Sequence, residues 1–315
     1  MKSAPQITIL IPTYNCGKFL YECIGSIVRQ SYGNFEILII DDGSTDNTEQ
    51  LLKGMKLPQL RYYRNNHNLG IVRSLNKGLK LAKGKYIARM DADDIMLGNR
   101  LEEQFLFLEQ NPEYGMVGGS YQIIDEAGIH RDTVHVKRDA HFLSLAILFR
   151  NQFHHATIMM RTDVAQQLKY SAKFPYCEDH ELWFRFTEVA KTTNLPGIYL
   201  SYRWHSDNSC SKNQSTLKTS VLSLISRELD KINVPHNVRE LMLHGSVSFG
   251  MATFKFRDES SVDELIKWYN KIFDSEILAQ RYQREWLNAF KKEILKAYCG
   301  IERENTIAKE DYVVS

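Results

Sequence analysis

Three carboxylates fall within four residues in the segment Asp91-Ala92-Asp93-Asp94, directly after a short apolar stretch that begins at Tyr86. A strand that ends on Asp-x-Asp carries two hard oxygen ligands to the edge of a sheet, and Mg²⁺ or Mn²⁺ accepts such ligands together with substrate phosphates. The same acids could instead form a turn that caps the following helix. Which interpretation holds depends on the residues at the other strand ends.

Strand and helix patterns alternate along the first hundred residues. Continuous apolar runs at residues 7–11 and 35–40 are typical of buried parallel strands. Apolar residues recur at helical spacing over residues 19–28 and 71–82, and residues 60–63 form a further strand pattern. The alternation predicts a layered α/β fold.

Polar residues follow three of the expected strands. In layered α/β folds, ligands collect outside the carboxyl ends of the parallel strands. Several polar clusters that converge on one edge are harder to explain as helix caps than any one of them alone. The three clusters are Pro12-Thr13-Tyr14-Asn15, Asp41-Asp42-Gly43-Ser44 and Asp91-Ala92-Asp93.

The order and spacing of these motifs over residues 5–210 resemble the family 2 glycosyltransferases with the GT-A fold. The resemblance rests on Pro12-Thr13-Tyr14-Asn15, Ile40-Asp41-Asp42-Gly43-Ser44-Thr45-Asp46, Asn68-Leu69-Gly70, Asn76-Lys77-Gly78 and Asp91-Ala92-Asp93-Asp94. It implies a Rossmann-like, mixed and mostly parallel sheet flanked by helices, in a catalytic domain over residues 1–214. Within that domain, residues 1–97 would bind the nucleotide sugar and residues 98–214 the acceptor.

The resemblance implies a nucleoside diphosphate sugar as the donor. Tyr14 matches the family's aromatic residue that stacks on the base. Asp42 matches the acid that accepts a hydrogen bond from the uracil imide N–H, a donor that cytosine lacks, so a UDP-sugar is favoured. Asp41 would brace the loop. The expected donor-binding residues are Pro12, Thr13, Tyr14, Asn15, Asp42, Asn68, Gly70, Asp91, Ala92 and Asp93.

The resemblance also implies a divalent metal, Mn²⁺ or Mg²⁺, which bridges the two phosphates and neutralises charge on the leaving nucleoside diphosphate. Asp93 would ligate the metal, and Asp91 would lie near the ribose or a metal-bound water. Alternation along an extended segment favours Asp93 over Asp94 as the ligand. His205 lies in a segment that matches the family's Tyr-Arg-x-His and would be a further metal ligand or a phosphate donor, braced by Arg203.

Glu178 and Asp179 form a second acidic centre. Carboxylates are favourable at a helix N-terminus, which would be a purely structural role. The pair also matches the family's Glu-Asp motif, in which the Asp is the general base that removes the acceptor proton and the Glu orients the loop. Trp183 could form part of the floor of the acceptor site, although a Trp at helical spacing more often packs in a core.

Two further patterns concern the acceptor half. A strand expected at residues 154–160 would point His154 and His155 to opposite faces of the sheet, which argues against a shared metal and leaves acceptor contact or packing. Processive polysaccharide synthases of the family carry Gln-x-x-Arg-Trp. This chain has Leu200 where the Gln would stand, which favours a single-addition enzyme.

The composition limits the partners and the compartment. With 315 residues and a formal net charge of +2, the chain gives no electrostatic reason to expect a nucleic acid partner. Its five cysteines include no Cys-x-x-Cys pair and are typical of reduced thiols. No apolar run approaches the roughly 18 residues that a membrane span needs. We therefore expect a cytoplasmic protein.

Residues 215–315 have helical spacing and predict a helical C-terminal extension without a catalytic motif. Residues 281–298 form a basic, aromatic, amphipathic stretch. Such a helix could make peripheral contact with the inner face of an anionic membrane. More often such a helix packs on the catalytic domain or on a second subunit, as in a homodimer.

Taken together, the residues and the resemblance predict an inverting, metal-dependent glycosyltransferase. It would move a sugar from a UDP-sugar to a hydroxyl of a glycan or lipid-linked acceptor, in surface polysaccharide biosynthesis. One alternative is a sugar-nucleotide pyrophosphorylase, which needs a Gly-rich, Arg/Lys-bearing loop after its first strand that this chain lacks. The other is a non-catalytic sugar-nucleotide or glycan-binding module, against which the presence of both Asp93 and Asp179 argues.

Overall fold

The computed structural model describes residues 4–206, 208, 212–248 and 259–299, and the chain divides into two units. Unit 1 comprises Met1–Ser144, Gln152–Lys173 and Glu178–Asn208. Unit 2 comprises Leu145–Asn151, Phe174–Cys177 and Ser209–Ser315. The domain boundary expected after residue 214 stays a prediction.

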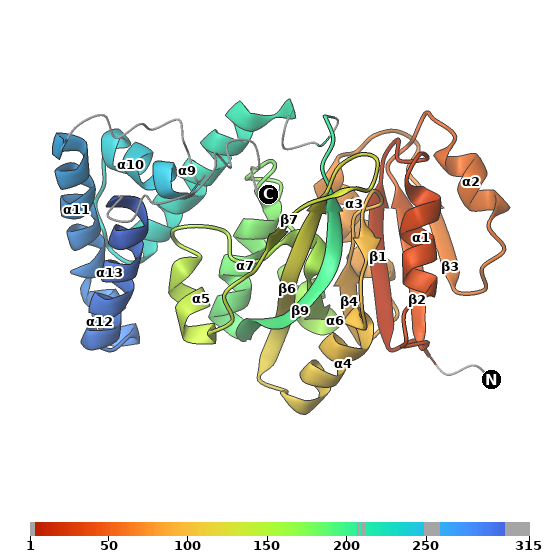
Figure 1. Ribbon diagram of the computed structural model, residues 1–315, viewed down its shortest axis with the longest axis horizontal. Helices are drawn as coiled ribbons and strands as arrows, with labels where there is room; N and C mark the ends of the chain where they lie inside the picture. The colour runs from red at the N-terminus through yellow and green to blue at the C-terminus, as the bar shows by residue number, and fades with distance from the viewer. Residues whose placement is uncertain (1–3, 207, 209–211, 249–258, 300–315) are drawn as a thin grey trace. The chain divides into compact units, whose positions relative to one another are not determined.

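Unit 1 is built on a nine-stranded sheet in the order β3-β2-β1-β4-β8-β6-β9-β5, with β7 paired to β6 (Figure 1). The strands β1 to β4 are parallel neighbours, and so are β6 and β9, whereas β5, β7 and β8 run the opposite way. The predicted mixed, mostly parallel sheet is thus confirmed. The strands are β1 (Ile7–Thr13), β2 (Phe35–Asp41), β3 (Leu60–Arg64), β4 (Tyr86–Arg89), β5 (Ile95–Met96), β6 (Tyr114–Ile124), β7 (His130–Val134), β8 (Met159–Arg161) and β9 (Lys191–Arg203).

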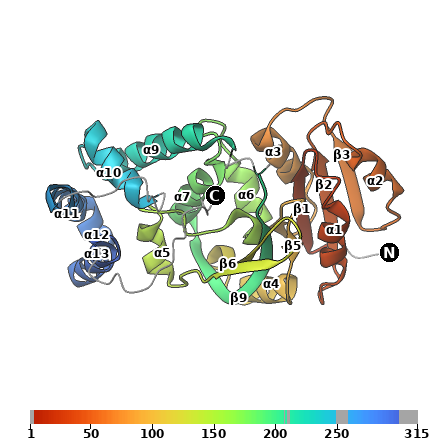
Figure 2. The ribbon, with the colours of Figure 1, turned by 45° about the horizontal axis from the view of Figure 1, so that its top comes forward.

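Helices cover both faces of this sheet. In Figure 2, α3, α6 and α7 lie above the sheet, and α1 and α4 lie below it. The close contacts of α3 with β1 and β2, and of α4 with β6 and β9, agree with this arrangement. The helices are α1 (Leu20–Val28), α2 (Thr48–Gly54), α3 (Ile71–Leu81), α4 (Arg100–Gln110), α6 (Thr162–Leu168) and α7 (Glu178–Val189), and α5 (Ala140–Ala146) continues from unit 1 into unit 2.

The core of unit 1 lies around the central parallel strands. All residues of β1 and β2 are buried, as their continuous apolar runs predict for strands covered on both faces. Helix α3 approaches β1 closely because it carries Gly78, where an added Cβ would come within 2.2 Å of the Leu10 side chain. The carboxyl ends of β1, β2 and β4 therefore lie on a rigid, closely packed layer.

The prediction of a strand over residues 154–160 was wrong in its extent. The strand β8 begins only at Met159, and His155–Thr157 form a 3₁₀ turn. Thr157 is responsible for this turn, because its N–H and its hydroxyl both donate to the His154 carbonyl oxygen, at 2.9 and 2.8 Å. His154 and His155 consequently do not alternate between two sheet faces, and both are buried.

Unit 2 is helical. It contains α9 (Gln214–Lys231), α10 (Val238–Ser248), α11 (Glu259–Phe273), α12 (Glu276–Arg281) and α13 (Arg284–Cys299). Its aromatic core is centred on Phe149, whose ring stacks on those of His244 and Phe273 at centroid distances of 5.1 and 5.6 Å. None of the described helices is long and apolar enough to cross a membrane.

In the amphipathic stretch predicted over residues 281–298, apolar side chains between residues 282 and 294 pack inside unit 2. Leu287 and Phe290 are buried, and α13 packs against α11. Trp286 stacks between Tyr282 and Phe290, at centroid distances of 5.1 and 5.4 Å. In this part of the stretch the apolar side chains already have partners in the same unit. Membrane contact and dimerisation through these helices stay predictions.

Candidate active site

The loops that follow β1 and β2 are tied to each other by Asn15. Its backbone φ is 54°, its side-chain oxygen accepts the Thr45 N–H at 2.8 Å, and its N–H donates to the Ser44 hydroxyl at 2.9 Å. Tyr14 in the same loop is 44% exposed, so a ligand could stack on its ring. Pro12 and Thr13 are buried at the end of β1, where they shape the loop.

Asp41 has a structural role at the end of β2. It is fully buried, and its carboxylate accepts hydrogen bonds from the Ser44 N–H at 2.8 Å and from the Tyr62 hydroxyl at 2.7 Å. These contacts hold the start of the loop in place, which agrees with the bracing role expected for this residue.

Asp42 organises the loop that leads into α3. Its carboxylate, 5% exposed, accepts hydrogen bonds from the Asn65 side chain at 2.8 Å and from the N–H groups of Leu69 at 2.9 Å and Gly70 at 2.8 Å. Gly70 has a φ of +88°, a conformation that favours glycine, and its N–H also donates to the Asn68 side chain at 3.1 Å. One of the two carboxylate oxygens accepts a single described bond, which leaves it able to accept another.

The acids at the end of β4 form a cluster. Asp91, Asp93 and Asp94 each offer a carboxylate oxygen, and the three oxygens lie within 4.8 Å of one another. Asp91 pairs with Arg89, two residues earlier on the same strand. Ala92 between the acids is buried, so its side chain shapes the turn. The cluster lies at the same sheet edge as the loops after β1 and β2, because these strands are parallel neighbours.

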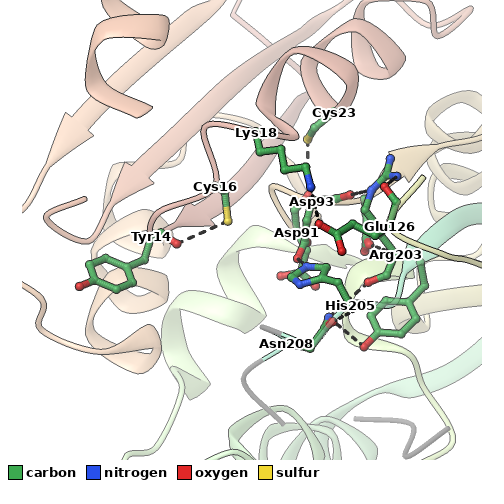
Figure 3. A network of polar contacts seen from close by, with 12 residues as sticks. Tyr14, Cys16, Lys18, Cys23, Asp91, Asp93, Glu126, Arg203, His205 and Asn208 are labelled. Atoms are coloured by element: carbon green, nitrogen blue, oxygen red, sulfur yellow. Dashed lines mark hydrogen bonds and ion pairs between the residues drawn. The ribbon is translucent and has the colours of Figure 1, made fainter. Parts of the chain in front are cut away.

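The long strand β9 carries Arg203 and His205 to this cluster (Figure 3). The Nε2 atom of His205 lies 3.0 Å from the Asp93 carboxylate. Arg203 is 2% exposed and donates from Nε to the Asp93 carbonyl oxygen at 2.9 Å, and its guanidinium pairs with Glu22 of α1. Both it and His205 pack on the ring of Phe19, at 4.9 and 5.3 Å. Arg203 thus contacts the Asp93 backbone and Phe19, and His205 faces the acids. That Arg203 braces His205 stays a prediction.

The two acids Asp93 and Asp94 differ in their surroundings. Asp94 is fully buried, and its Oδ1 atom accepts the Arg203 N–H at 2.8 Å. Burial, with the nearby charges of Asp93 and Asp91, raises the pKa of Asp94 well above its usual value. The side chains of Asp91 and Asp93 keep 32% and 17% of their surface exposed. These two are thus the accessible members of the cluster, and Asp94 lies behind them.

The donor set of this cluster fits a divalent cation. Carboxylate oxygens are the ligands of Mg²⁺ and Mn²⁺, and an imidazole nitrogen such as that of His205 suits a transition metal. The Oδ2 atom of Asp94 is buried without a hydrogen-bond partner, so a cation would also satisfy an otherwise unpaired oxygen.

Glu178 and Asp179 lie in the first turn of α7, and they are 8% and 6% exposed. Burial and the adjacent charge of Asp179 raise the pKa of Glu178 to about 7. The charges of Arg89 and Asp91 also act on Glu178. An acid pair of this kind can hold one proton and accept another.

Trp183 does not line the surface of the site. Its side chain is fully buried in α7 and meets the His155 ring edge to face, at 5.6 Å between centroids. Trp183 therefore packs in the core and does not form the floor of an acceptor site.

Sequence reasoning missed Arg89. Arg89 is 4% exposed, and its charge acts on His154, His155, Tyr170 and Glu178. Its only available signal was its position two residues before Asp91, which puts both side chains on the same face of β4. Burial lowers the pKa of His154 to about 3 and that of His155 well below its usual value, so both rings stay neutral.

Comparisons with known proteins agree with this geometry. The model of the family described as "Glycosyl transferase family 2" matches residues 8–169. An uncharacterized glycosyltransferase of Haemophilus influenzae is 32% identical over 250 residues, which cover 74% of this chain and 77% of the relative. A putative glycosyltransferase of Bacillus subtilis, EpsE, is 36% identical over 60% of this chain and 69% of its own.

Two solved structures have a similar fold. Residues 1–349 of S. aureus TarS, in complex with UDP-GlcNAc, match with a TM-score of 0.58 at 17% identity, over 96% of this chain and 95% of that one. A mannosyltransferase of Pyrobaculum calidifontis, in complex with GDP-Man and Mn²⁺, matches with a TM-score of 0.53 at 14% identity, over 96% of this chain and 77% of the other. At these identities the likeness shows the fold alone, and that fold is the predicted GT-A fold. The sequence matches show more: this chain belongs to glycosyl transferase family 2.

Proposed function

We propose that the protein is an inverting, metal-dependent glycosyltransferase that moves a sugar from a UDP-sugar to a hydroxyl of a glycan or lipid-linked acceptor. The observation that carries the proposal is the cluster of Asp91, Asp93 and Asp94, in which the charge of Asp91 also acts on Glu178 of the buried pair Glu178–Asp179. Metal-type acids and a separate carboxylate pair are what a transfer from a nucleoside diphosphate needs. Similarity to structures with bound UDP-GlcNAc and GDP-Man supports a nucleotide-sugar donor.

The loops after β1 and β2 would bind the nucleoside. The exposed ring of Tyr14 would stack on the base, and Asp42 would accept the imide N–H of uracil at its less used oxygen. Asp42 also fixes the N–H groups of Leu69 and Gly70, so the same carboxylate would shape the wall of the base site. A pyrimidine with an N–H at this position is the base that a carboxylate favours.

Asp93 and His205 would hold the divalent cation, with Asp91 directed at the ribose or a metal-bound water. When bound, the cation would neutralise negative charge on the diphosphate. Arg203 would keep Asp93 and His205 in place through its bond to the Asp93 backbone and its packing on Phe19. The protein's own contribution here is orientation.

Asp179 would act as the general base. The acceptor O–H would give its proton to this carboxylate while its oxygen bonds to the anomeric carbon, and the bond from that carbon to the β-phosphate oxygen would break on the opposite face. The configuration would therefore invert. Glu178, with a pKa of about 7, would hold a proton beside Asp179 over much of the neutral range and so avoid two adjacent buried negative charges.

The acceptor is proposed from analogy with the family, as a hydroxyl on a growing surface glycan or on its lipid-linked precursor. Leu200 in place of the Gln of the processive synthases supports the addition of a single sugar. The extension in unit 2 would serve acceptor or subunit contacts.

The test is nucleotide release from a panel of UDP-sugars and GDP-mannose, with Mn²⁺ and with a chelator, over several glycan acceptors. We expect UDP release that needs the metal. Asp179→Asn should lower kcat by about 10²–10⁴ while UDP still binds, because a general base contributes that much. Asp93→Asn should abolish the metal-dependent part of UDP binding.

Asp263→Asn, an exposed acid in unit 2, is the matched control and should behave as the wild type. No release from any nucleotide sugar would refute the enzymatic proposal. Turnover of Asp179→Asn within a few-fold of the wild type would refute the role of the base.

A further inference from the structure

Lys18 is an exposed cation beside the acidic cluster. It lies two residues before α1, and its ammonium pairs with the carboxylate of Glu126, in the turn between β6 and β7. The ammonium is 5.1 Å from the centroid of the Phe19 ring, which in turn is 5.3 Å from the His205 ring. One aromatic ring therefore separates Lys18 from a residue that contacts Asp93. Figure 3 shows the Lys18 side chain extended toward Glu126.

Among the described residues, Arg203 and Arg89 also contact the acidic cluster, and both are already paired with a carboxylate. Arg203 is 2% exposed and its guanidinium is bound to Glu22. Arg89 is 4% exposed and is paired with Asp91. The side chain of Lys18 is 65% exposed, so it can reorient without unpacking the core. Lys18 is thus an exposed cation that a ligand at this edge could recruit.

We propose that Lys18 binds the diphosphate of the donor and that the Lys18 ammonium pairs with Glu126 when no diphosphate is bound. The inference rests on the proposed function, because it takes the diphosphate to lie at the acidic cluster. When the bond to the anomeric carbon breaks, its electron pair passes to the β-phosphate oxygen, and the diphosphate gains a negative charge. An ammonium group with three N–H donors on a flexible stem can follow that charge.

The ion pair with Glu126 is suited to such an exchange. Its side chains are 65% and 54% exposed, and pairs this exposed contribute little because water and salt screen them. A diphosphate carries more negative charge than one carboxylate and is the stronger partner for an ammonium. The turn itself would stay in place when the ammonium leaves, because the Glu126 carbonyl oxygen also accepts a hydrogen bond from Arg203 at 3.1 Å.

The test compares two variants that break the same ion pair. Binding of UDP with Mn²⁺ is measured by calorimetry for the wild type, Lys18→Ala and Glu126→Gln, with uridine as the ligand without phosphates. We expect Lys18→Ala to weaken UDP binding about tenfold, equivalent to about 1.4 kcal/mol, and to leave uridine binding unchanged. Glu126→Gln should tighten UDP binding a few-fold, because the ammonium no longer has to leave a carboxylate.

A purely structural role for the ion pair would shift UDP binding in the same direction in both variants, and that result would overturn the inference. Equal UDP binding by Lys18→Ala and the wild type would also overturn it. Lys53→Ala is the matched control, since Lys53 forms another exposed Lys–Glu pair and its side chain is 66% exposed. If the wild type itself binds no nucleoside diphosphate, the proposed function fails, and the role of Lys18 fails with it.

Discussion

Replacing Glu178 with Gln should change how the stability of the protein depends on pH. The pKa of Glu178 is about 7 in the folded chain, against an ordinary value of 4.5, because of burial and the charge of Asp179. The folded chain therefore holds this proton more tightly than the unfolded chain. The stabilisation from the protonated group is complete below pH 4.5 and is lost as the pH rises through 7.

The magnitude follows from the size of the shift. A shift of one pKa unit corresponds to about 1.4 kcal/mol. Ionisation of Glu178 should therefore lower the free energy of unfolding by about 3 kcal/mol from acid to alkaline pH. Gln has nearly the same shape and cannot ionise, so Glu178→Gln removes that cost. The free energy of unfolding is measured with urea at pH 5.0 and 8.5. We expect the variant to gain about 2–3 kcal/mol relative to the wild type between these two values.

Glu188→Gln, at an exposed position of the same helix, is the control and should show no such gain. A difference between Glu178→Gln and the wild type that changes by less than about 0.5 kcal/mol between the two pH values would refute the reasoning. It would mean that the Glu178 carboxylate is ionised in the folded protein and that its charge is compensated, with Arg89 as a candidate because its charge lowers the pKa of Glu178.

Two further changes test residues away from α7. Asp42→Asn keeps one acceptor oxygen but turns an NH₂ group toward a backbone N–H such as that of Gly70. We expect the free energy of unfolding in urea to fall by about 2 kcal/mol and UDP binding, measured by calorimetry, to weaken. Unchanged values of both would contradict the role of Asp42. Burial lowers the pKa of His154 to about 3, so its contribution to stability is present above its ordinary value of 6.5 and is lost as the pH falls toward 3. When the pH falls from 7 to 4, the free energy of unfolding of His154→Phe should therefore decrease by about 3 kcal/mol less than that of the wild type. An equal decrease in both proteins would show that another group causes the acid destabilisation.

Elements with long, uniform patterns could be predicted from the sequence. The strands β1 and β2 and the helix α3 were expected close to their observed bounds, because burial on both faces or on one helical face leaves a regular apolar pattern. The strand β5 is two residues long and leaves no period to detect. The strand expected from residue 154 failed because the side chain of Thr157 bonds to the backbone and bends the chain before β8.

Some residues of the candidate site could be predicted from the sequence, and others could not. Asp42, Asp91 and Asp93 were found because each is an acid at the end of an apolar strand, a position that can be read locally. Arg89 and Glu22 were missed because their importance arises from contacts made only after folding, with Asp91 and with Arg203. The sequence has no period or motif that marks such partners.

The position of β8 in the sheet has a consequence for how the chain can be divided. The strand β4, which ends in the acidic cluster, pairs on one side with β1 and on the other with β8, a segment from the acceptor half. A fragment that stopped at residue 97 would leave the backbone groups of this buried strand unpaired, and an open edge of this kind recruits strands from other chains. Chimeras of related enzymes joined at that point would have to pair β4 of one parent with β8 of the other. Exchanges that keep β4 and β8 from the same parent preserve the native pairing.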